Sequence, residues 1–187
     1  MDWIIKTTVK LDAILPIVDN LTNTLDAIDL SKEPKSTRGN KSVQWQLFGV
    51  KDNEWVELVE AIKIKIKEEW KKKFDQDILL ALAGAWTVKG QEHSYHTLHN
   101  HQKGNTDVSK RISTVIYLQM PEKRWNGDGA FYFVIQEKEK SISYHIDPEP
   151  GTHVIMPSEM LHGAYPQPAG LRQTLNLDFQ WKVDDKE

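Results

Sequence analysis

The segment from residue 78 to the end of the sequence restricts the possible folds more than any other part. Its β-branched and aromatic residues come in short runs separated by Gly, Pro, Asn and Asp, and no helical stripe in it is longer than two turns. These runs predict six strands, over residues 78–87, 111–118, 130–135, 141–146, 153–156 and 173–182. Strands of this length and spacing favour a β-sandwich or a β-barrel over a parallel sheet.

The part of the chain before these strands has a different pattern. Alternating apolar residues predict a short strand over residues 3–9, and apolar residues at helical spacing predict a first helix over 11–28. A second helix is predicted over 55–74, with Asp52 or Asn53 as its N-cap. We therefore expect helices that support a β-rich core.

One domain is expected over residues 1–187, because this length is within the usual size of a single globular unit. Within it, residues 1–77 are predicted to form the N-terminal support and residues 78–187 the core. The polar segment 31–42 contains Pro and Gly and is predicted to be a loop.

The composition excludes several classes of function. No apolar run approaches the roughly 20 residues that cross a bilayer, and no secretory signal pattern opens the sequence. The chain has no cysteine, so disulfides, thiolate zinc sites and cysteine nucleophiles are excluded. Its net charge of −3, with Lys and Glu interspersed, provides no basic face for nucleic acid. We expect a cytoplasmic protein that binds neither membranes nor nucleic acid.

Four of the seven histidines lie within nine positions, at His93, His96, His99 and His101. Imidazole is a common metal ligand, and residues two apart in an extended chain point to the same side, so His99 and His101 can converge on one ion. His96 is expected on the opposite face. Because a polar loop with exposed histidines explains this cluster equally well, a metal site needs a third ligand from elsewhere.

The third ligand suggested by the sequence is His162, which ends a segment of turns and a short apolar strand over residues 147–162. Arg172 follows ten residues later. Three protein ligands on one side of an iron ion leave room for a chelating 2-oxo acid and for O2. The planar guanidinium of an arginine suits the far carboxylate of such a co-substrate. Alone, His162 and Arg172 are ordinary surface or strand residues; with His99 and His101 they favour an iron site.

Several motifs between residues 85 and 181 occur in the order seen in one known family. They are residues 85–90, 99–101, 111–118, 127–133 and 148–157, then His162, Arg172 and residues 176–181. In these motifs the sequence resembles the iron(II)/2-oxoglutarate-dependent oxygenases. The resemblance is greatest to the prolyl-4-hydroxylase-like branch and to small phage-type oxygenases.

The resemblance implies a mainly β fold, a double-stranded β-helix or jelly-roll barrel that two N-terminal helices buttress. It implies that His99, His101 and His162 bind Fe(II), and that Arg172 and the Tyr117 hydroxyl bind 2-oxoglutarate as co-substrate. The expected reaction is hydroxylation of a small molecule or of a protein side chain.

One position departs from the family pattern. Most members carry Asp or Glu two residues after the first histidine, whereas this chain carries His101. The nearest carboxylate that could take its place is Asp107. A neutral set of three histidines should hold Fe(II) less tightly, although the carboxylates of 2-oxoglutarate would bring the loaded site close to neutrality.

Two other interpretations remain open. A cupin-type metal protein, or a dioxygenase that needs no 2-oxoglutarate, would also explain the spacing of Gly151, Pro157 and His162, but residues 102–105 lack the Glu of the first cupin motif. A catalytically inactive β-barrel binding protein would explain the missing carboxylate.

The remaining expectations concern two histidines and one tryptophan. His145 and His153 are expected to be ordinary strand residues. Trp125, in a polar loop that contains Gly, is expected either to line the pocket mouth or to cover the rim of the barrel.

Overall fold

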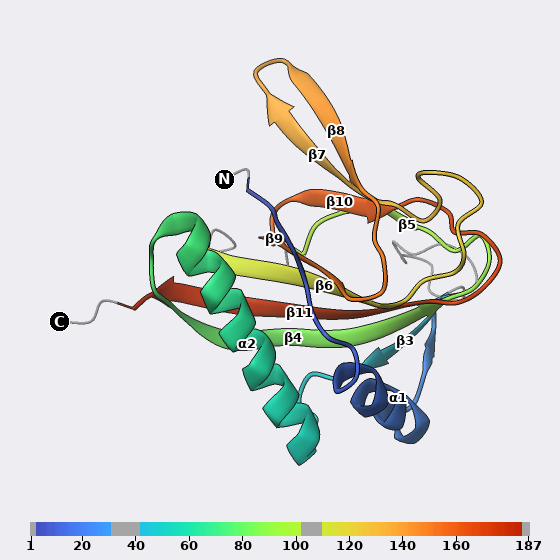
Figure 1. Ribbon diagram of the computed structural model, residues 1–187, viewed down its shortest axis with the longest axis horizontal. Coiled ribbons are helices and arrows are strands. Elements are labelled where there is room, and N and C mark those ends of the chain that lie inside the picture. The colour runs from blue at the N-terminus through green and yellow to red at the C-terminus, as the bar shows by residue number, and fades with distance from the viewer. Residues whose placement is uncertain (1–2, 31–41, 102–109, 185–187) are drawn as a thin grey trace.

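The computed structural model describes residues 3–30, 42–101 and 110–184. Two helices and eleven strands occur within these ranges (Figure 1). In chain order they are β1 (Ile5–Thr8), α1 (Ile14–Thr24), β2 (Ile28–Asp29), β3 (Ser42–Gln46), α2 (Asn53–Phe74), β4 (Ile78–Gly90), β5 (His96–His99), β6 (Arg111–Gln119), β7 (Phe131–Glu137), β8 (Lys140–Ile146), β9 (Thr152–Pro157), β10 (Leu161–Ala164) and β11 (Arg172–Val183).

The strands form two antiparallel sheets. The larger sheet has the order β1-β9-β6-β11-β4-β3-β2 and the smaller one the order β5-β10-β7-β8. Both helices lie against one face of the larger sheet, and β10 and β5 lie over its other face (Figure 1). The fold is therefore mainly β, a double-stranded β-helix type of sandwich with two supporting helices, as the sequence predicted.

All six strands predicted in the C-terminal part are present, with ends that differ by a few residues. Four further strands, β2, β3, β5 and β10, were not predicted. The missed β5 reads His-Thr-Leu-His and β10 reads Leu-His-Gly-Ala, so both are short and poor in β-branched residues. Their pairing with neighbouring strands, rather than local preference, makes them extended.

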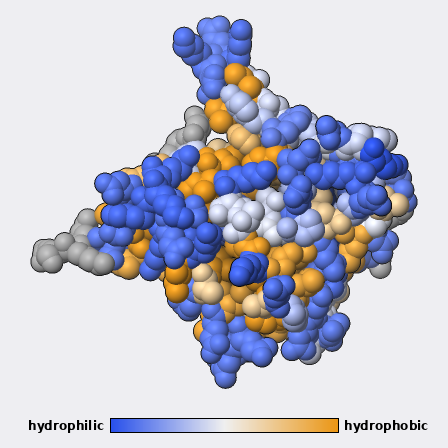
Figure 2. Space-filling view, in the orientation of Figure 1, coloured by the Kyte–Doolittle hydropathy of each residue, from blue (hydrophilic) through white to orange (hydrophobic). Residues whose placement is uncertain are grey.

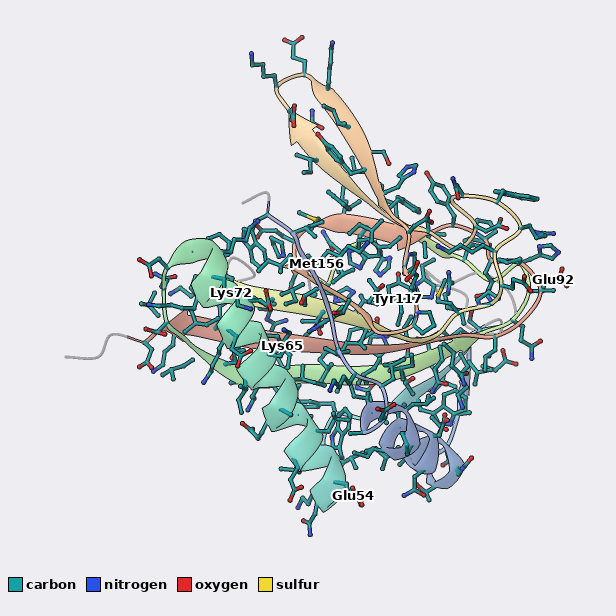
Figure 3. The ribbon with its side chains drawn as sticks, viewed as in Figure 1. Glu54, Lys65, Lys72, Glu92, Tyr117 and Met156 are labelled. Atoms are coloured by element: carbon teal, nitrogen blue, oxygen red, sulfur yellow. The ribbon has the colours of Figure 1, made fainter. Side chains whose placement is uncertain are left out.

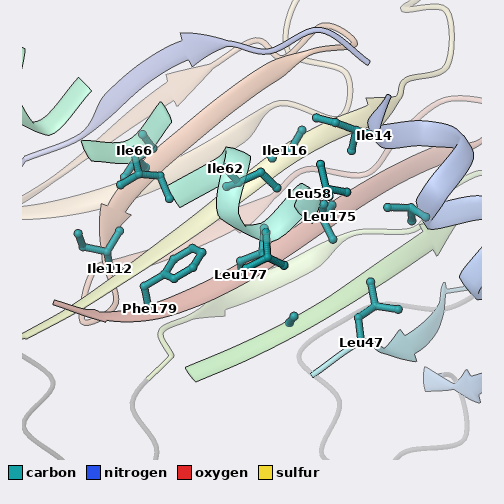
Figure 4. Close-up of a cluster of buried hydrophobic side chains, with 14 of the residues drawn as sticks. Ile14, Leu47, Leu58, Ile62, Ile66, Ile112, Ile116, Leu175, Leu177 and Phe179 are labelled. Carbon is teal, nitrogen blue, oxygen red and sulfur yellow. The ribbon is translucent and has the colours of Figure 1, made fainter. Parts of the chain in front are cut away.

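Helix α2 begins where the sequence predicted. The Asp52 side chain caps it by accepting a hydrogen bond of 3.0 Å from the Trp55 backbone N–H. One stripe of the helix is buried against the larger sheet, where it meets apolar residues of β6 and β11 (Figure 4). The labelled members of this core are Ile14, Leu47, Leu58, Ile62, Ile66, Ile112, Ile116, Leu175, Leu177 and Phe179. Neither helix in the described part of the chain combines the length and apolar character of a membrane span.

Strand β11 has the apolar core on one face and a pocket on the other. Leu175 and Leu177 belong to the core under the helices, whereas Thr174 and Asn176 line a pocket on the opposite face. This alternation follows from the two-residue period of a strand. The larger sheet thus has an apolar face toward α2 and a polar face toward the smaller sheet.

The β7–β8 hairpin extends away from the rest of the molecule (Figure 1). Its tip is hydrophilic in the space-filling view, and the turn between the strands is made by Lys138 and Glu139 (Figure 2). The base of the hairpin continues into the smaller sheet, where β7 pairs with β10.

Candidate metal centre

The structure brings the three predicted histidines together between the two sheets. His99 ends β5, His101 follows two residues later, and His162 lies on β10. Their ligand atoms all lie within 4.8 Å of one another. The ring centroids of His99 and His162 are 4.4 Å apart, and those of His101 and His162 are 4.9 Å apart.

Backbone carbonyls orient two of these rings. Nδ1 of His99 donates a hydrogen bond of 2.7 Å to the carbonyl oxygen of Thr97, and Nδ1 of His162 donates one of 2.9 Å to that of Met160. A carbonyl oxygen only accepts, so in both rings Nδ1 carries the proton. Nε2 is then the atom that each ring offers to a metal, and an orienting bond of this kind usually accompanies a histidine ligand.

The third ring is oriented by a carboxylate instead. Nδ1 of the buried His101 lies 2.8 Å from Oδ1 of Asp178 and 2.9 Å from Oγ of Ser113. Ser113 on β6 lies directly opposite Asp178 on β11, and its hydroxyl donates a bond of 2.7 Å to the same Oδ1. The backbone N–H of His101 donates to the carbonyl oxygen of Ser158 at 2.9 Å.

Asp178 is the main residue that the sequence analysis missed, since it appeared there only within the motif 176–181. The signal that could have identified it is the polar alternation of β11. Arg172, Thr174, Asn176 and Asp178 recur at every second position, whereas an ordinary core strand carries apolar residues on its buried face.

His96 was expected to point away from the other histidines, and this expectation was wrong, because His96 lines the same pocket. In the β5–β10 pair, His99 lies opposite His162, but His96 lies opposite Ala164, so β5 contains one extra residue. Such a β-bulge breaks the alternation of side chains. His93 is exposed and stays outside the cluster.

Arg172, at the start of β11, lines the same pocket as the three histidines. Its side chain is 2% exposed; Nη1 donates a long bond of 3.4 Å to the Tyr165 carbonyl, and Nη2 has no hydrogen-bond partner among the described residues. Burial lowers the pKa of the guanidinium, an effect that Tyr117 opposes. A buried cation with so few partners is costly, and a bound anion would offset that cost.

Tyr117 lies on β6 between the two sheets and also lines the pocket (Figure 3). Burial raises the pKa of its hydroxyl, and the nearby Arg172 opposes this shift. The phenol is therefore protonated at neutral pH and can donate a hydrogen bond to an anion held by Arg172.

The remaining predicted residues lie elsewhere. His145 is exposed on β8, with Nε2 3.2 Å from the Tyr165 hydroxyl, and His153 is buried on β9; neither belongs to the cluster. Trp125 is 62% exposed, contacts the Arg124 guanidinium and does not line the pocket. Asp107 lies outside the described residues.

Comparison with known proteins gives no match to a family model and no match to a curated protein sequence. Solved structures do match. A prolyl-4-hydroxylase from Pseudomonas putida superposes with a TM-score of 0.63 at 13% identity, covering 95% of this chain and 91% of that one. An oxidoreductase of the 2OG-Fe(II) oxygenase family from Burkholderia pseudomallei gives a TM-score of 0.67 at 12% identity, with 95% and 84% covered.

A third similar structure is HygX from Streptomyces hygroscopicus, which has nickel and 2-oxoglutarate bound. Its TM-score is 0.65 at 12% identity, and 95% of this chain and 82% of HygX are covered. This chain therefore has the fold of the 2-oxoglutarate/Fe(II) oxygenases over nearly its whole length. At such low identity the likeness establishes the fold, and the chemistry must be argued from the residues of the pocket.

Proposed function

We propose that this protein is an Fe(II)- and 2-oxoglutarate-dependent dioxygenase that hydroxylates a small molecule or a protein side chain. The observation that carries the proposal is the pairing, in one pocket, of three histidines with a buried arginine. The ligand atoms of His99, His101 and His162 lie within 4.8 Å of one another, and Nη2 of Arg172 has no hydrogen-bond partner among the described residues. A site of this kind suits a metal ion and an organic anion together.

The residues present fit the metal. His99 and His162 use Nδ1 for hydrogen bonds to carbonyl oxygens, which leaves Nε2 as the ligand atom of each. Three protein ligands also leave coordination positions for other groups, as the iron sites of oxygenases require. When bound, iron and 2-oxoglutarate supply the oxidising chemistry: one oxygen atom of O2 enters the substrate, and 2-oxoglutarate becomes succinate and CO2.

The residues also fit the co-substrate. The Arg172 guanidinium would pair with the carboxylate of 2-oxoglutarate that lies away from the metal, and the Tyr117 hydroxyl would donate a second hydrogen bond to it. Both side chains are buried, so little water competes for this carboxylate. The pair would orient the co-substrate and hold its oxo-acid end toward the three histidines.

The test is turnover of 2-oxoglutarate to succinate with Fe(II) under air, together with anaerobic titration of the absorption band that 2-oxoglutarate gives on Fe(II). We expect the wild type to show both signals. Arg172→Gln should retain iron but lose affinity for 2-oxoglutarate by about 100-fold, the scale of a charged hydrogen-bonded pair. Arg124→Gln, which removes an arginine outside the pocket, should behave as wild type.

Other outcomes would identify the alternatives. Iron binding without any response to 2-oxoglutarate, in the wild type as in Arg172→Gln, would favour a cupin-type protein. Failure to bind iron under all conditions would favour a non-enzymatic β-barrel binding protein. Either result would refute the proposed function.

A further inference from the structure

We infer that Asp178 is a positioning residue for the metal centre, and that its carboxylate supplies, from behind His101, the negative charge that the three histidine ligands lack. This inference rests on the proposed function only in that it requires a metal at the three histidines. It assigns a role to a residue that does not itself reach the metal.

The first argument is geometric. Nδ1 of His101 is 2.8 Å from Oδ1 of Asp178, and a carboxylate oxygen accepts, so Nδ1 carries the proton and Nε2 is left as the ligand atom. Asp178 cannot turn away easily, because Oδ1 also accepts from Ser113 at 2.7 Å. Both residues are buried on paired strands of the larger sheet.

The second argument concerns the difference between the three rings. Nδ1 of His99 and Nδ1 of His162 each donate to a neutral backbone carbonyl, whereas Nδ1 of His101 donates to a carboxylate. A carboxylate partner draws the Nδ1 proton more strongly than a carbonyl, which makes the opposite nitrogen a better electron donor. His101 is thus the ligand that carries partial negative charge to the metal.

The third argument is the charge of the buried site. Fe(II) and the Arg172 guanidinium together exceed the two negative charges of 2-oxoglutarate by one positive charge. A family member with an Asp ligand cancels this excess directly. Here the Asp178 carboxylate cancels it from the far side of the His101 ring. An uncompensated charge in a pocket with little water raises the free energy of the bound state. The contact between His101 and Asp178 therefore favours metal binding.

The network beyond Asp178 supports the same role. Oγ of Ser113 lies 2.7 Å from Oγ of Ser158, and the Ser158 backbone carbonyl accepts the His101 N–H at 2.9 Å. The His101 ring and backbone are therefore held by adjoining parts of one buried polar network. Removing the charge of Asp178 while keeping its shape separates the electrostatic effect from this packing.

The experiment measures Fe(II) affinity, with Co(II) as an air-stable probe, in the absence of 2-oxoglutarate and of turnover. Asp178→Asn should bind either metal about 10- to 100-fold more weakly than wild type, the usual cost of losing such an orienting partner. Ser113→Ala, which keeps the charge of Asp178, should lose less metal affinity than Asp178→Asn. Asp128→Asn removes a buried carboxylate that contacts the Arg124 backbone instead, and it should bind as wild type.

A second pair of variants tests the charge itself. His101→Asp supplies a carboxylate ligand directly and offsets the excess positive charge, so the charge of Asp178 is no longer needed there. In this background Asp178→Asn should change metal affinity little, whereas in the wild-type background it weakens binding. The same loss in both backgrounds would show a purely structural role and would overturn the inference.

The outcomes separate this inference from the proposed function. If wild type and Asp178→Asn bind metal equally well, the inference fails while the proposed function stands. If the wild type binds neither metal, both fail. If the metal affinities follow the expected pattern but 2-oxoglutarate is not converted, the inference stands and the proposed co-substrate is wrong.

Discussion

His99 and His162 are directly opposed partners in the β5–β10 pair, and their ring centroids lie 4.4 Å apart. The strands that carry them have four residues each and were not predicted from sequence. A metal held by both rings would therefore join two short strands at their point of contact.

The first prediction is that metal binding stabilises the protein. Co(II) or Ni(II) at about 100 times its Kd should increase the free energy of unfolding by about 2.7 kcal/mol, because the unfolded chain lacks the assembled site. Thermal melting with and without a chelator measures this. His162→Ala should abolish the increase, and His145→Ala, which alters an exposed histidine outside the cluster, should retain it. An equal response in both variants would contradict the assignment of His162.

The second prediction decides between His101 and Asp107 as a ligand. His101→Ala should lower Fe(II) affinity by at least about 100-fold, since it removes one of three ligands and with it the link to the Asp178 carboxylate. Asp107→Ala should bind as wild type. Anaerobic titration followed by absorption compares the two variants. A loss confined to Asp107→Ala would transfer the ligand role to that carboxylate.

The third prediction concerns Tyr117. Tyr117→Phe should weaken 2-oxoglutarate binding by roughly 3- to 10-fold, the value of one hydrogen bond, and leave iron affinity unchanged. Because burial raises the pKa of the Tyr117 hydroxyl, the wild-type phenol stays protonated and the ratio should be constant from about pH 6 to about pH 9. Isothermal titration of the Fe(II)-loaded proteins with 2-oxoglutarate measures this ratio of affinities. Tyr144→Phe, on the exposed β8, is the control; a ratio that falls toward unity with rising pH would argue against a donating phenol.

The fourth prediction is a pH dependence of stability that originates outside the site. His153 is fully buried, neither ring nitrogen has a hydrogen-bond partner in the described part of the chain, and burial lowers its pKa from 6.5 to about 3. As pH falls below about 6.5, the unfolded chain takes up a proton that the folded chain refuses. The contribution of His153 is thus complete above about pH 6.5 and is lost toward about pH 3, at no more than about 1.4 kcal/mol per pH unit.

His153→Leu removes this titration and keeps an apolar side chain in the core. Urea unfolding between about pH 7 and about pH 4 should therefore show a flatter decline for His153→Leu than for the wild type. His93→Gln, at an exposed position, should keep the wild-type slope. Parallel slopes for wild type and His153→Leu would show that His153 is protonated in the folded state.

The sequence predicted those parts of the structure in which local pattern and tertiary environment agree. Helix α2 has a cap at Asp52 and a continuous apolar stripe, and its limits were found within two residues. The strands rich in β-branched residues were also found. The short strands β5 and β10 lack such a pattern and are extended because they pair, so only the folded structure reveals them.

The candidate site was likewise predictable only in those residues that local spacing reveals. The spacing of His99 and His101 and the later His162 sufficed to bring out the three histidines. The position of His96 depends on a bulge, and the role of Asp178 depends on a contact across 77 residues of sequence. Neither a one-residue insertion in a strand pair nor the partner of a distant carboxylate is visible in local spacing.

Two of the three rings donate to the carbonyl oxygen of the residue two positions earlier in the chain, at Thr97 and Met160. These acceptors are main-chain atoms, so they stay in place when surrounding side chains are exchanged. The hydrogen bonds that keep the proton on Nδ1 of His99 and His162 are then retained. The His101 ring, in contrast, contacts the side chains of Asp178 and Ser113. By the inference above, exchange of residue 178 would change the electron density that His101 offers to a metal, while the backbone acceptors of His99 and His162 stay in place.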